Sequence, residues 1–254
     1  MSEPSTSAIM LRRVEYGESD MIVTLFSLER GKMSVFAKGA KKSKKRFAGA
    51  LELFNLLEVV VTQGKKKGLF MLQEADIKKP YECIRTNIKK TAYASYFTEL
   101  ITDWCEEFEK QSDLFRLISD TFDLLNDETY SEEVLSILFQ VKFLSLCGIS
   151  PNLLQCVSCQ RGVDEINEKE IILDLERGGL ICEKCKRSSF KRVYLSKGTI
   201  KRLQWIESRD MAKACRIRFT PMAVKEGLQF LESFVPYHLG KIPKSLKFIH
   251  RIRT

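Results

Sequence analysis

Several features that would place a protein in a membrane or a secretory pathway are missing from this sequence of 254 residues. No apolar run approaches the ~18 residues that a membrane-spanning helix needs. The N-terminal stretch MSEPSTSA has neither the charged start nor the apolar core of a signal peptide. Because nothing directs the chain out of the cytosol, we expect a cytoplasmic protein.

Motifs that hold nucleotide phosphates or build hydrolytic sites are also missing. The Gly-Lys pairs at 31–32 and 240–241 lack the upstream glycine and the following Ser or Thr of a phosphate-binding loop. No G-x-G-x-x-G follows a predicted strand, and no G-x-S-x-G occurs. The only histidines, His238 and His250, stand in different contexts. We therefore predict that the protein is not an enzyme.

Charge is abundant and unevenly spread along the chain. The sequence is 44% hydrophobic and 30% charged, which is ordinary for a globular protein, and its formal net charge is +9. Lys and Arg exceed Asp and Glu before residue 80 and after residue 150, whereas acids are in excess between them. Two basic ends around an acidic middle indicate separate modules, with a polyanion bound by one or both ends.

The first 80 residues have the pattern of β structure. Short runs rich in Val, Ile, Leu and Phe, separated by Gly-containing turns, predict five strands. These are Ala8–Val14, Met21–Ser27, Met33–Ala37, Phe54–Thr62 and Leu69–Ile77. A long connection after the third strand fits a small Greek-key barrel of the OB type, whose exposed face and loops bind single strands. A five-stranded SH3-like barrel would have the same spacing.

That long connection contains a cationic segment, Lys38–Arg46, with six cations in nine positions and no acid. They are Lys38, Lys41, Lys42, Lys44, Lys45 and Arg46. Small residues between them let the backbone approach a ligand, and a nucleic-acid backbone supplies a matching row of negative charges. A second cluster lies in the hairpin between the last two strands, and we predict DNA contacts there too, from Lys65, Lys66 and Lys67. For each cluster the alternative is a solvated loop that only keeps the protein soluble.

Four phenylalanines interleave with these charges: Phe36, Phe47, Phe54 and Phe70. Their rings could stack on nucleic-acid bases. A Phe on a predicted strand more often belongs to the core, and we favour that interpretation.

After Pro80 the apolar period changes from two residues to 3.6, which predicts helices. Three apolar stripes indicate an α-helical bundle, from Tyr93 to Trp104, from Leu114 to Leu125 and from Val134 to Leu144. The acids of this region lie near predicted helix starts or on polar faces, and no paired spacing or nearby histidine gives them a reaction. We interpret these acids as structural.

Two C-x-x-C pairs, separated by 22 residues, form the most specific motif. Their thiolates, from Cys156, Cys159, Cys182 and Cys185, can close a tetrahedral site around one Zn²⁺. Four sulfur ligands leave no open position for water, so we predict a structural zinc ion. Disulfides are not expected in a cytosolic chain. The other cysteines stand alone on apolar patterns and are predicted to be buried thiols: Cys83, Cys105, Cys147 and Cys215.

Helical patterns return after the zinc-binding motif, at Thr199–Ile206 and Ala223–Val235, where Pro221 suits the first turn of the second helix. A third helix is predicted in the tail. One of its faces would carry Leu246, Ile249 and Ile252, and another Lys244, Lys247 and Arg251. The basic face is either a second phosphate-contacting strip or the outer side of a packed terminal helix.

The predicted fold class is therefore α+β and multidomain. We expect a five-stranded OB-type barrel at 1–80 and an α-helical domain at 81–150. A C4 zinc-binding module is expected at 151–192, inserted before C-terminal helices at 193–254 that pack with the helical domain.

Several short motifs accompany this organisation. They are Tyr16-Gly-Glu-Ser-Asp20, Val23-Thr-Leu-Phe26, Gly31-Lys-Met-Ser34, the run from Ala37 to Phe47, and Gly49-Ala-Leu-Glu-Leu-Phe54. The order of barrel, helices, C-x-x-C, Gly178-Gly179 and C-x-x-C continues over nearly the whole chain. In these respects the sequence resembles the DNA repair protein RecO family.

The resemblance implies an OB-fold domain, a helical domain and a zinc-binding module. It also implies a non-enzymatic recombination mediator that binds single- and double-stranded DNA and anneals complementary strands. With RecR, such a mediator helps RecA replace single-strand-binding protein, so the implied setting is a bacterial cytoplasm, in association with the nucleoid. Not every member of the family keeps the four cysteines, and this chain keeps them.

Two other classes remain compatible with the residues. A zinc-ribbon OB-fold accessory factor of transcription or translation, binding RNA, would share the barrel, the C4 motif and the basic charge. A fragment of a nuclease or ligase is the third class. An assay for annealing of strands that are precoated with single-strand-binding protein would separate a recombination mediator from both of these classes.

We expect purified protein to show no ATPase or nuclease turnover, because the sequence has no nucleotide-phosphate motif and no paired acidic site. Phosphate release and strand cleavage are the two measurements. Turnover that disappears when the aspartates of one cluster are changed to asparagine would contradict this expectation.

Overall fold

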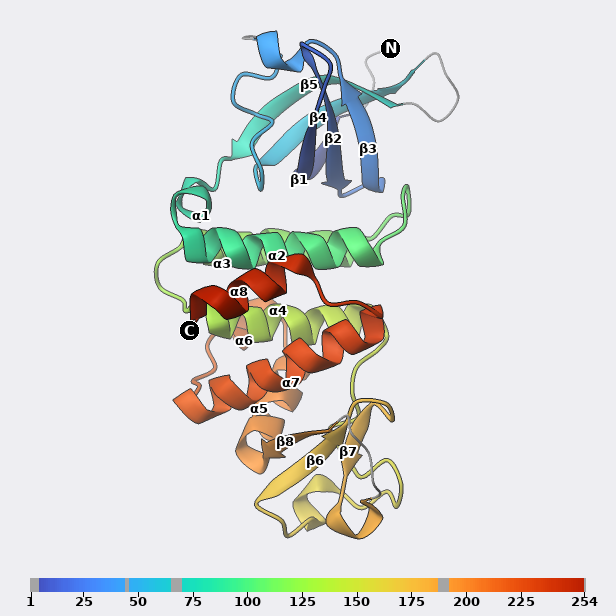
Figure 1. Cartoon of the computed structure of the whole chain (residues 1–254), viewed down its shortest axis with the longest axis vertical. Coiled ribbons are helices and arrows are strands. Elements are labelled where there is room, and N and C mark those ends of the chain that lie inside the picture. Colours follow the sequence, from blue (N-terminus) through green and yellow to red (C-terminus); the bar gives the residue numbers. More distant parts are fainter. Residues whose placement is uncertain (1–4, 44–45, 65–69, 187–191, 254) are drawn as a thin grey trace. The chain divides into compact units, whose positions relative to one another are not determined.

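The structure is a computed structural model that describes residues 5–43, 46–64, 70–186 and 192–253. Its contacts divide the chain into two compact units (Figure 1). The first unit comprises residues 1–129 together with 248–254, and the second comprises residues 130–247. This division is by contacts alone, and the four-part domain plan drawn from the sequence stays a prediction.

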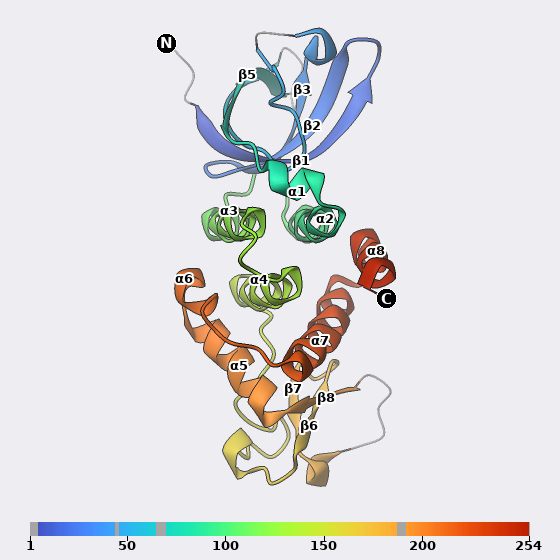
Figure 2. The same cartoon turned by 90° about the vertical axis from the view of Figure 1, so that its left-hand side faces the viewer.

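Five strands form a closed barrel in the first unit: β1 (Thr6–Tyr16), β2 (Asp20–Ser27), β3 (Gly31–Ala37), β4 (Leu56–Gln63) and β5 (Phe70–Lys79). Their order around the barrel is β1-β2-β3-β5-β4, and β1 pairs with β4 to close it. All pairs are antiparallel except β3 with β5. Figure 2 shows how β5 curves around the barrel. The predicted OB-type barrel is confirmed.

Alternate strand residues fill the barrel, as the period of two predicts. Val23, Leu25, Met33 and Val35 are at most 1% exposed. The connection between β3 and β4 adds its own apolar side chains to this core, from Phe47, Ala50 and Leu51. That connection is therefore fixed to the barrel at its middle.

Three helices complete the described part of the first unit up to residue 129: α1 (Glu82–Thr86), α2 (Ile88–Trp104) and α3 (Ser112–Asn126). Asn87 caps α2, its side chain accepting hydrogen bonds from the Lys89 and Lys90 backbone N–H groups. The barrel meets α3 through edge-on aromatic contact, with the Phe54 and Phe122 ring centroids 5.7 Å apart.

The loop between α2 and α3 adds a short parallel bridge to β3. The Phe108 N–H donates to the Lys32 carbonyl at 2.8 Å, and Lys32 Nζ donates to the Thr102 carbonyl at 2.7 Å. Gly31 makes this approach possible, because a Cβ there would lie 1.7 Å from the Glu109 carbonyl oxygen. Barrel and helices are joined by backbone as well as by side chains.

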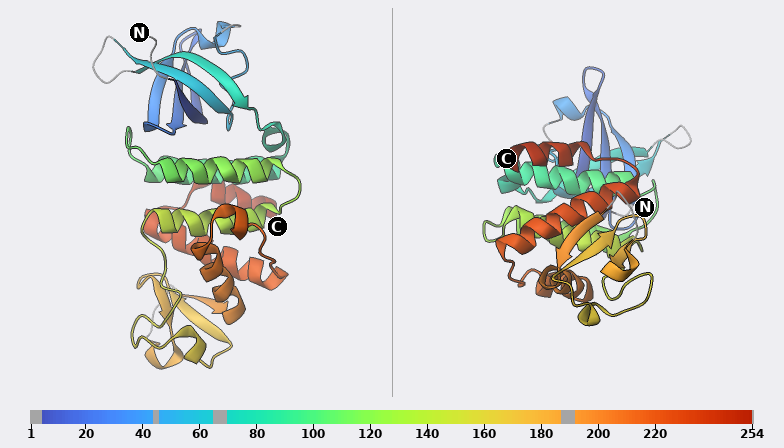
Figure 3. Two further views of the ribbon diagram at one scale, coloured as in Figure 1. Left: turned by 180° about the vertical axis from the view of Figure 1, so that it is seen from behind. Right: turned by 60° about the horizontal axis from the view of Figure 1, so that its bottom comes forward.

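The second unit contains α4 (Glu132–Leu146), α5 (Lys197–Ser208), α6 (Met211–Ala214) and α7 (Pro221–Leu239). It also contains a three-stranded sheet of β6 (Glu170–Asp174), β7 (Gly179–Ile181) and β8 (Arg192–Ser196), drawn in yellow to orange in Figure 3. The last helix, α8 (Lys244–Arg253), begins in the second unit and ends in the first. The three helices predicted from 93 to 144, the two predicted around 199–206 and 223–235, and the tail helix are confirmed.

Glu226 of α7 joins the helices of the second unit to its sheet. Its carboxylate accepts hydrogen bonds from the Ser196 N–H and hydroxyl, at 3.0 and 2.8 Å, and from the Thr199 hydroxyl at 2.5 Å. Ser196 ends β8 and caps α5. One nearly buried carboxylate thus fixes the junction of β8 and α5 against α7.

Two details differ from the sequence interpretation. The strand β8 was not predicted, and it places β6 in the middle of its sheet rather than at an edge. Cys83 is exposed and Cys147 and Cys215 are half-buried, so of the four isolated cysteines only Cys105 is the buried thiol that was expected. In the described ranges, no helix is long and apolar enough to cross a membrane.

We expect Gly31→Ala to destabilise the first unit more than Gly17→Ala. Both glycines have positive φ, +65° and +59°, so each change costs about 1–2 kcal/mol for the left-handed backbone. Only at Gly31 does the new Cβ meet backbone, and we expect a total loss of at least ~3 kcal/mol there. Urea unfolding followed by circular dichroism measures both, and equal losses would contradict the close approach to Glu109.

Candidate nucleic-acid interface and metal centre

The start of the cationic segment is fastened to the hairpin between β1 and β2. The Gly39 N–H donates to Asp20 Oδ1 at 2.7 Å, and the Lys41 N–H donates to the Ser19 carbonyl at 2.9 Å. Gly39 precedes a single 3-10 turn, Ala40–Lys42, which contains Lys41 and whose Ala40 is buried. These bonds hold the segment at the end of the barrel, so its first half is an ordered surface.

The positive charge of Lys41 is partly neutralised by groups of the same chain. Its Nζ lies 2.6 Å from Glu15 Oε2 and 3.2 Å from the Gly17 carbonyl. The hydrogen bond and the positive charge of Lys41 lower the pKa of Glu15 below its ordinary value. Phosphate would have to compete with Glu15 for this ammonium group.

The side chain of Arg46, the last residue of the cationic segment, contacts Lys38, the first residue. Its Nη2 donates to the Lys38 carbonyl at 2.7 Å, and its guanidinium lies 4.9 Å from the centre of the Phe47 ring. The guanidinium of Arg46 is therefore held next to Lys38 by its hydrogen bond and against the buried Phe47 by its contact with the ring. Both ends of the segment are therefore close together.

Lys38 and Lys42 are exposed, and among the described residues neither has an ion pair. They are the two described cations of the segment best placed for a polyanion. Lys44 and Lys45 of the segment, and Lys65, Lys66 and Lys67 of the second cluster, lie outside the described residues. Their predicted DNA contacts stay predictions.

The four phenylalanines divide into two pairs. Phe47 and Phe54 are buried, 3% and 2% exposed, as expected of core residues. Phe36 and Phe70 are half-buried, and their rings meet Tyr16 and Phe108 at centroid distances of 5.6 and 4.5 Å. Phe70 packs against the barrel core, whereas Phe36 alternates with the buried Val35 and Ala37 and faces outward.

Asp120 and Asp123 are two acids of α3 that interact electrostatically. Burial, and after it the charge of Asp123, raise the pKa of Asp120. Asp123 is bound by Lys79 Nζ, 2.7 and 2.8 Å from its two oxygens, and by the Tyr81 hydroxyl at 2.9 Å. These partners use its oxygens to join β5 to α3, which agrees with a structural interpretation.

The two C-x-x-C pairs come together in the second unit. The four Sγ atoms of Cys156, Cys159, Cys182 and Cys185 lie within 4.8 Å of one another. The Cys159 and Cys182 sulfur atoms are 3.7 Å apart, too far for a disulfide. Two sulfur atoms of a zinc tetrahedron with Zn–S bonds of 2.3 Å are separated by about 3.8 Å. The group could hold a metal ion.

Backbone geometry brings the two pairs together. The first is a tight turn, in which the Cys156 N–H donates to the Arg161 carbonyl at 2.8 Å. The second follows β7, and the Cys182 N–H points at Cys156 Sγ, 3.4 Å away. Gly179 allows β7 to lie against the first turn, because a Cβ there would be 2.4 Å from the Val157 side chain.

The thiols themselves favour a cation. Burial raises the pKa of Cys156, but N–H groups of Cys182, Cys159 and Ser158 outweigh burial and lower that pKa to about 6. Hydrogen bonds with Cys159 and Cys182 raise the pKa of Cys185 to about 12. Four thiolates so close together would need a cation between them.

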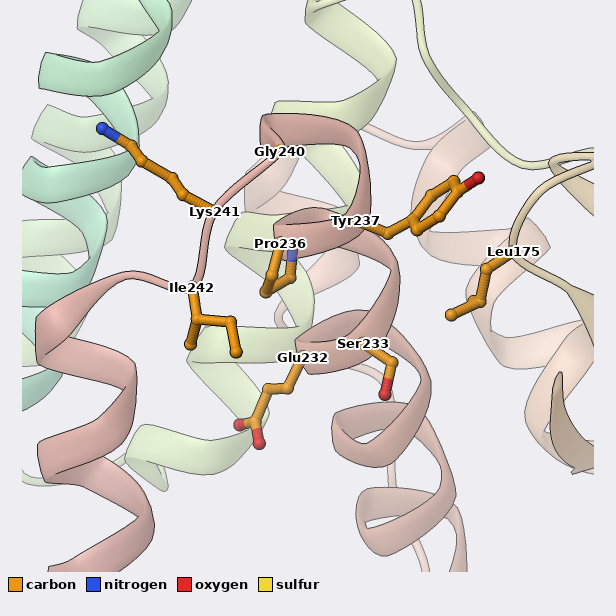
Figure 4. A pocket seen from close by; sticks show the side chains of 8 residues that line it. All are labelled: Leu175, Glu232, Ser233, Pro236, Tyr237, Gly240, Lys241 and Ile242. Carbon is orange, nitrogen blue, oxygen red and sulfur yellow. The ribbon is translucent and has the colours of Figure 1, made fainter. Parts of the chain in front are cut away.

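An open hollow of about 580 Å³ lies elsewhere in the second unit (Figure 4). Its walls come from the end of α7, the residues that follow it, and Leu175. In Figure 4 the Tyr237 ring points toward Leu175, whereas the Lys241 side chain points away from it. The site residues predicted from the sequence do not line this hollow.

Two acids of the interface were not identified from the sequence as site residues. Asp20 and Glu15 hold the cationic segment through Gly39 and Lys41, at sequence separations of 19 and 26 residues. A signal was present, since Asp20 ends the motif that begins at Tyr16 and Glu15 immediately precedes it. However, acids that precede a basic loop by 19 or 26 residues follow no known motif. Their contacts with the cationic segment are therefore visible only in the structure.

Comparison with known proteins gives two family models that together match most of the chain. The model described as recombination protein O N terminal matches residues 1–81, and the model described as recombination protein O C terminal matches residues 85–247. Proteins named DNA repair protein RecO are similar over nearly their whole length. The protein from Desulfatibacillum aliphaticivorans is 42% identical over 254 residues, which cover 100% of this chain and 98% of the relative. That from Desulfosudis oleivorans is also 42% identical, over 98% of each chain. That from Bacillus pumilus is 31% identical over 98% of this chain and 94% of the relative.

We expect Cys182→Ser to lose bound metal and to destabilise the second unit, because metal binding by converging thiolates is coupled to folding. Cys83→Ser is the matched control, since Cys83 is exposed and outside the cluster. Metal content by elemental analysis and thermal unfolding are the measurements. Full metal content in the Cys182→Ser protein would show that these four sulfur atoms are not the ligands.

Proposed function

The chain belongs to the RecO family of DNA repair proteins, which act in DNA repair and recombination, and from this we propose that its barrel binds DNA. The observation that supports this proposal most is the fastened cationic segment. Lys38 and Lys42 are exposed on it, and Arg46 is held beside Lys38 by its hydrogen bond to the Lys38 carbonyl. Cations whose backbone is ordered in advance bind phosphates with less loss of conformational entropy than a mobile loop would.

Binding by this segment is electrostatic and independent of base sequence. Each phosphate contact on a single strand contributes roughly −0.7 to the slope of log affinity against log salt. If all six cations of the cationic segment contact phosphates, their summed contribution is about −4. Lys41 is expected to contribute less than the others, because Glu15 already lies 2.6 Å from it. The proposed contacts of Lys65, Lys66 and Lys67 would add to this sum.

We propose further that the protein anneals complementary strands and, with RecR, helps RecA replace single-strand-binding protein on DNA. A cationic surface that screens two phosphate backbones is the simplest way in which a protein that uses no ATP can pair them. The function proposed is that of a non-enzymatic mediator, in which binding free energy rather than chemistry changes the state of the DNA.

The proposed metal is one structural Zn²⁺ bound by Cys156, Cys159, Cys182 and Cys185. Four thiolate ligands suit zinc and leave no position for a reacting water molecule. When bound, the ion would neutralise part of the thiolate charge and hold the turn at Cys156 against β7. Its role would be to stabilise the module that carries β6, β7 and β8.

We expect the double change Lys38→Gln and Lys42→Gln to weaken single-strand binding by a similar factor on every sequence and to flatten the salt slope by about 1.4. Annealing of strands precoated with single-strand-binding protein should slow in parallel. Fluorescence anisotropy between low and moderate salt measures affinity and slope.

The matched control is Lys201→Gln with Lys213→Gln, which removes the same charge from exposed lysines that pair with Asp164 and Asp210 in the second unit. We expect little change in this variant. If the control weakens binding more than the first variant does, the DNA site belongs to the second unit and the proposal for the barrel is wrong.

A further inference from the structure

The four cysteines of the candidate metal centre differ in their exposure to solvent. Cys156 and Cys182 are 0% and 1% exposed, and Cys185 is half-buried. Cys159 is the exposed member of the group. It lies in the tight turn between Cys156 and Gln160, whose N–H donates to the Cys156 carbonyl at 2.9 Å. A dissolved oxidant therefore reaches the sulfur atom of Cys159 before it reaches the buried sulfur atoms of the group.

A second sulfur atom lies close to the exposed one. Cys182 Sγ is 3.7 Å from Cys159 Sγ, so the two atoms need to approach by about 1.7 Å to reach the length of a disulfide bond. Cys182 directly follows β7, whereas Cys159 belongs to the turn against which β7 lies. A bond between these two cysteines would join the same two pieces of backbone that the metal centre brings together.

We propose that Cys159 is a redox-sensitive modification site, at which oxidation by hydrogen peroxide leads to a disulfide with Cys182 that links the two C-x-x-C pairs. The inference rests on the proposed zinc site and adds to it a reversible response to oxidants. A disulfide of this kind is compatible with a reducing compartment, where disulfides in proteins are transient and sense oxidants.

The chemistry needs one molecule of hydrogen peroxide and no other co-reactant. The Cys159 thiolate attacks one peroxide oxygen, the O–O bond breaks, and a sulfenic acid and a hydroxide ion form. The Cys182 thiolate then attacks the sulfenic sulfur atom, and the S–O bond breaks to expel a second hydroxide ion. The two sulfur atoms lose two electrons in total, and protons from solvent convert both hydroxide ions to water.

The disulfide changes what the cluster can hold. Only the thiolates of Cys156 and Cys185 remain, and two ligands are too few for the closed tetrahedral set of a structural zinc ion. Loss of the ion therefore accompanies oxidation. Because the new bond still joins the turn at Cys159 to the end of β7, the module keeps its connection after the ion has left. A disulfide within one C-x-x-C pair would leave the two pairs unconnected.

The experiment treats full-length wild-type protein with an equimolar amount of hydrogen peroxide. A colour-forming chelator measures zinc release, and mass spectrometry of peptides, after alkylation of the free thiols, identifies the disulfide. We expect cross-linked peptides that contain Cys159 and Cys182, and zinc release in proportion to them. Dithiothreitol with added zinc should restore the metal content.

Two variants test the role of Cys159. Cys159→His and Cys185→His each keep a Cys3His ligand set, which zinc accepts. We expect Cys159→His to slow zinc release several-fold, because the exposed thiol is gone, whereas Cys185→His should still form the disulfide between Cys159 and Cys182. Cys83→Ser removes an exposed thiol outside the cluster and should release zinc as wild type does.

The outcomes separate this inference from the zinc site on which it rests. If purified wild-type protein contains no zinc, the proposed zinc site is wrong, and the disulfide map alone decides the inference. Zinc that is retained under peroxide, or a disulfide within one C-x-x-C pair, overturns the inference and leaves the zinc site standing. Equal protection by Cys159→His and Cys185→His also overturns it. If either histidine variant fails to fold or to bind metal, the wild-type map still gives the answer.

Discussion

A parallel seam between β3 and β5 closes the barrel on one side, and much of the first unit depends on it. Among the described residues the seam pairs Val35 with Phe70 and Phe36 with Met71. Parallel neighbours cannot be joined by a tight turn, so the chain must leave β3, travel to β4 and return along β5 before the seam can form. The excursion that contains the cationic segment is a consequence of this topology. So is the position of β5 beside β3, since the seam brings these two strands together.

Acids organise the basic surface. Asp20 fixes the backbone at Gly39, and Glu15 positions Lys41 while reducing its charge. Mutual repulsion would otherwise spread closely spaced lysines, and side-chain entropy would have to be lost when a polyanion gathers them. Holding the backbone with Asp20 leaves Lys38 and Lys42 exposed on an ordered turn. A surface that is less basic than its sequence suggests can thus be better prepared for phosphate.

Local patterns in the sequence predict strands and helices well. They fail where the structure depends on contacts between residues that are distant in the sequence. The strand alternation in 6–79 and the helical stripes after Pro80 are short-range signals, and both are confirmed. The four cysteines were recognised because each pair is local, and the turn at Gly178-Gly179 brings the pairs together. The strand β8 was missed because no Gly or Pro separates it from α5, so that Ser196 serves as the last residue of one element and the cap of the next. Cys83 lies in the five-residue α1, which is too short to show a helical period, and the ion pair of Lys41 with Glu15 spans 26 residues.

The path of the chain between the two units has a mechanical consequence. The second unit begins after Thr129, and the last residues of the chain return to the first unit, where Arg253 Nη2 donates to the Tyr93 hydroxyl at 2.7 Å and Ile249 is buried. The second unit is therefore an insertion tethered at both of its ends. A single cut between α3 and α4 would leave the pieces connected through α8, and each unit would keep the other at a high effective concentration. A force applied between the two units would be shared by two crossings of the chain, one after Thr129 and one in α8.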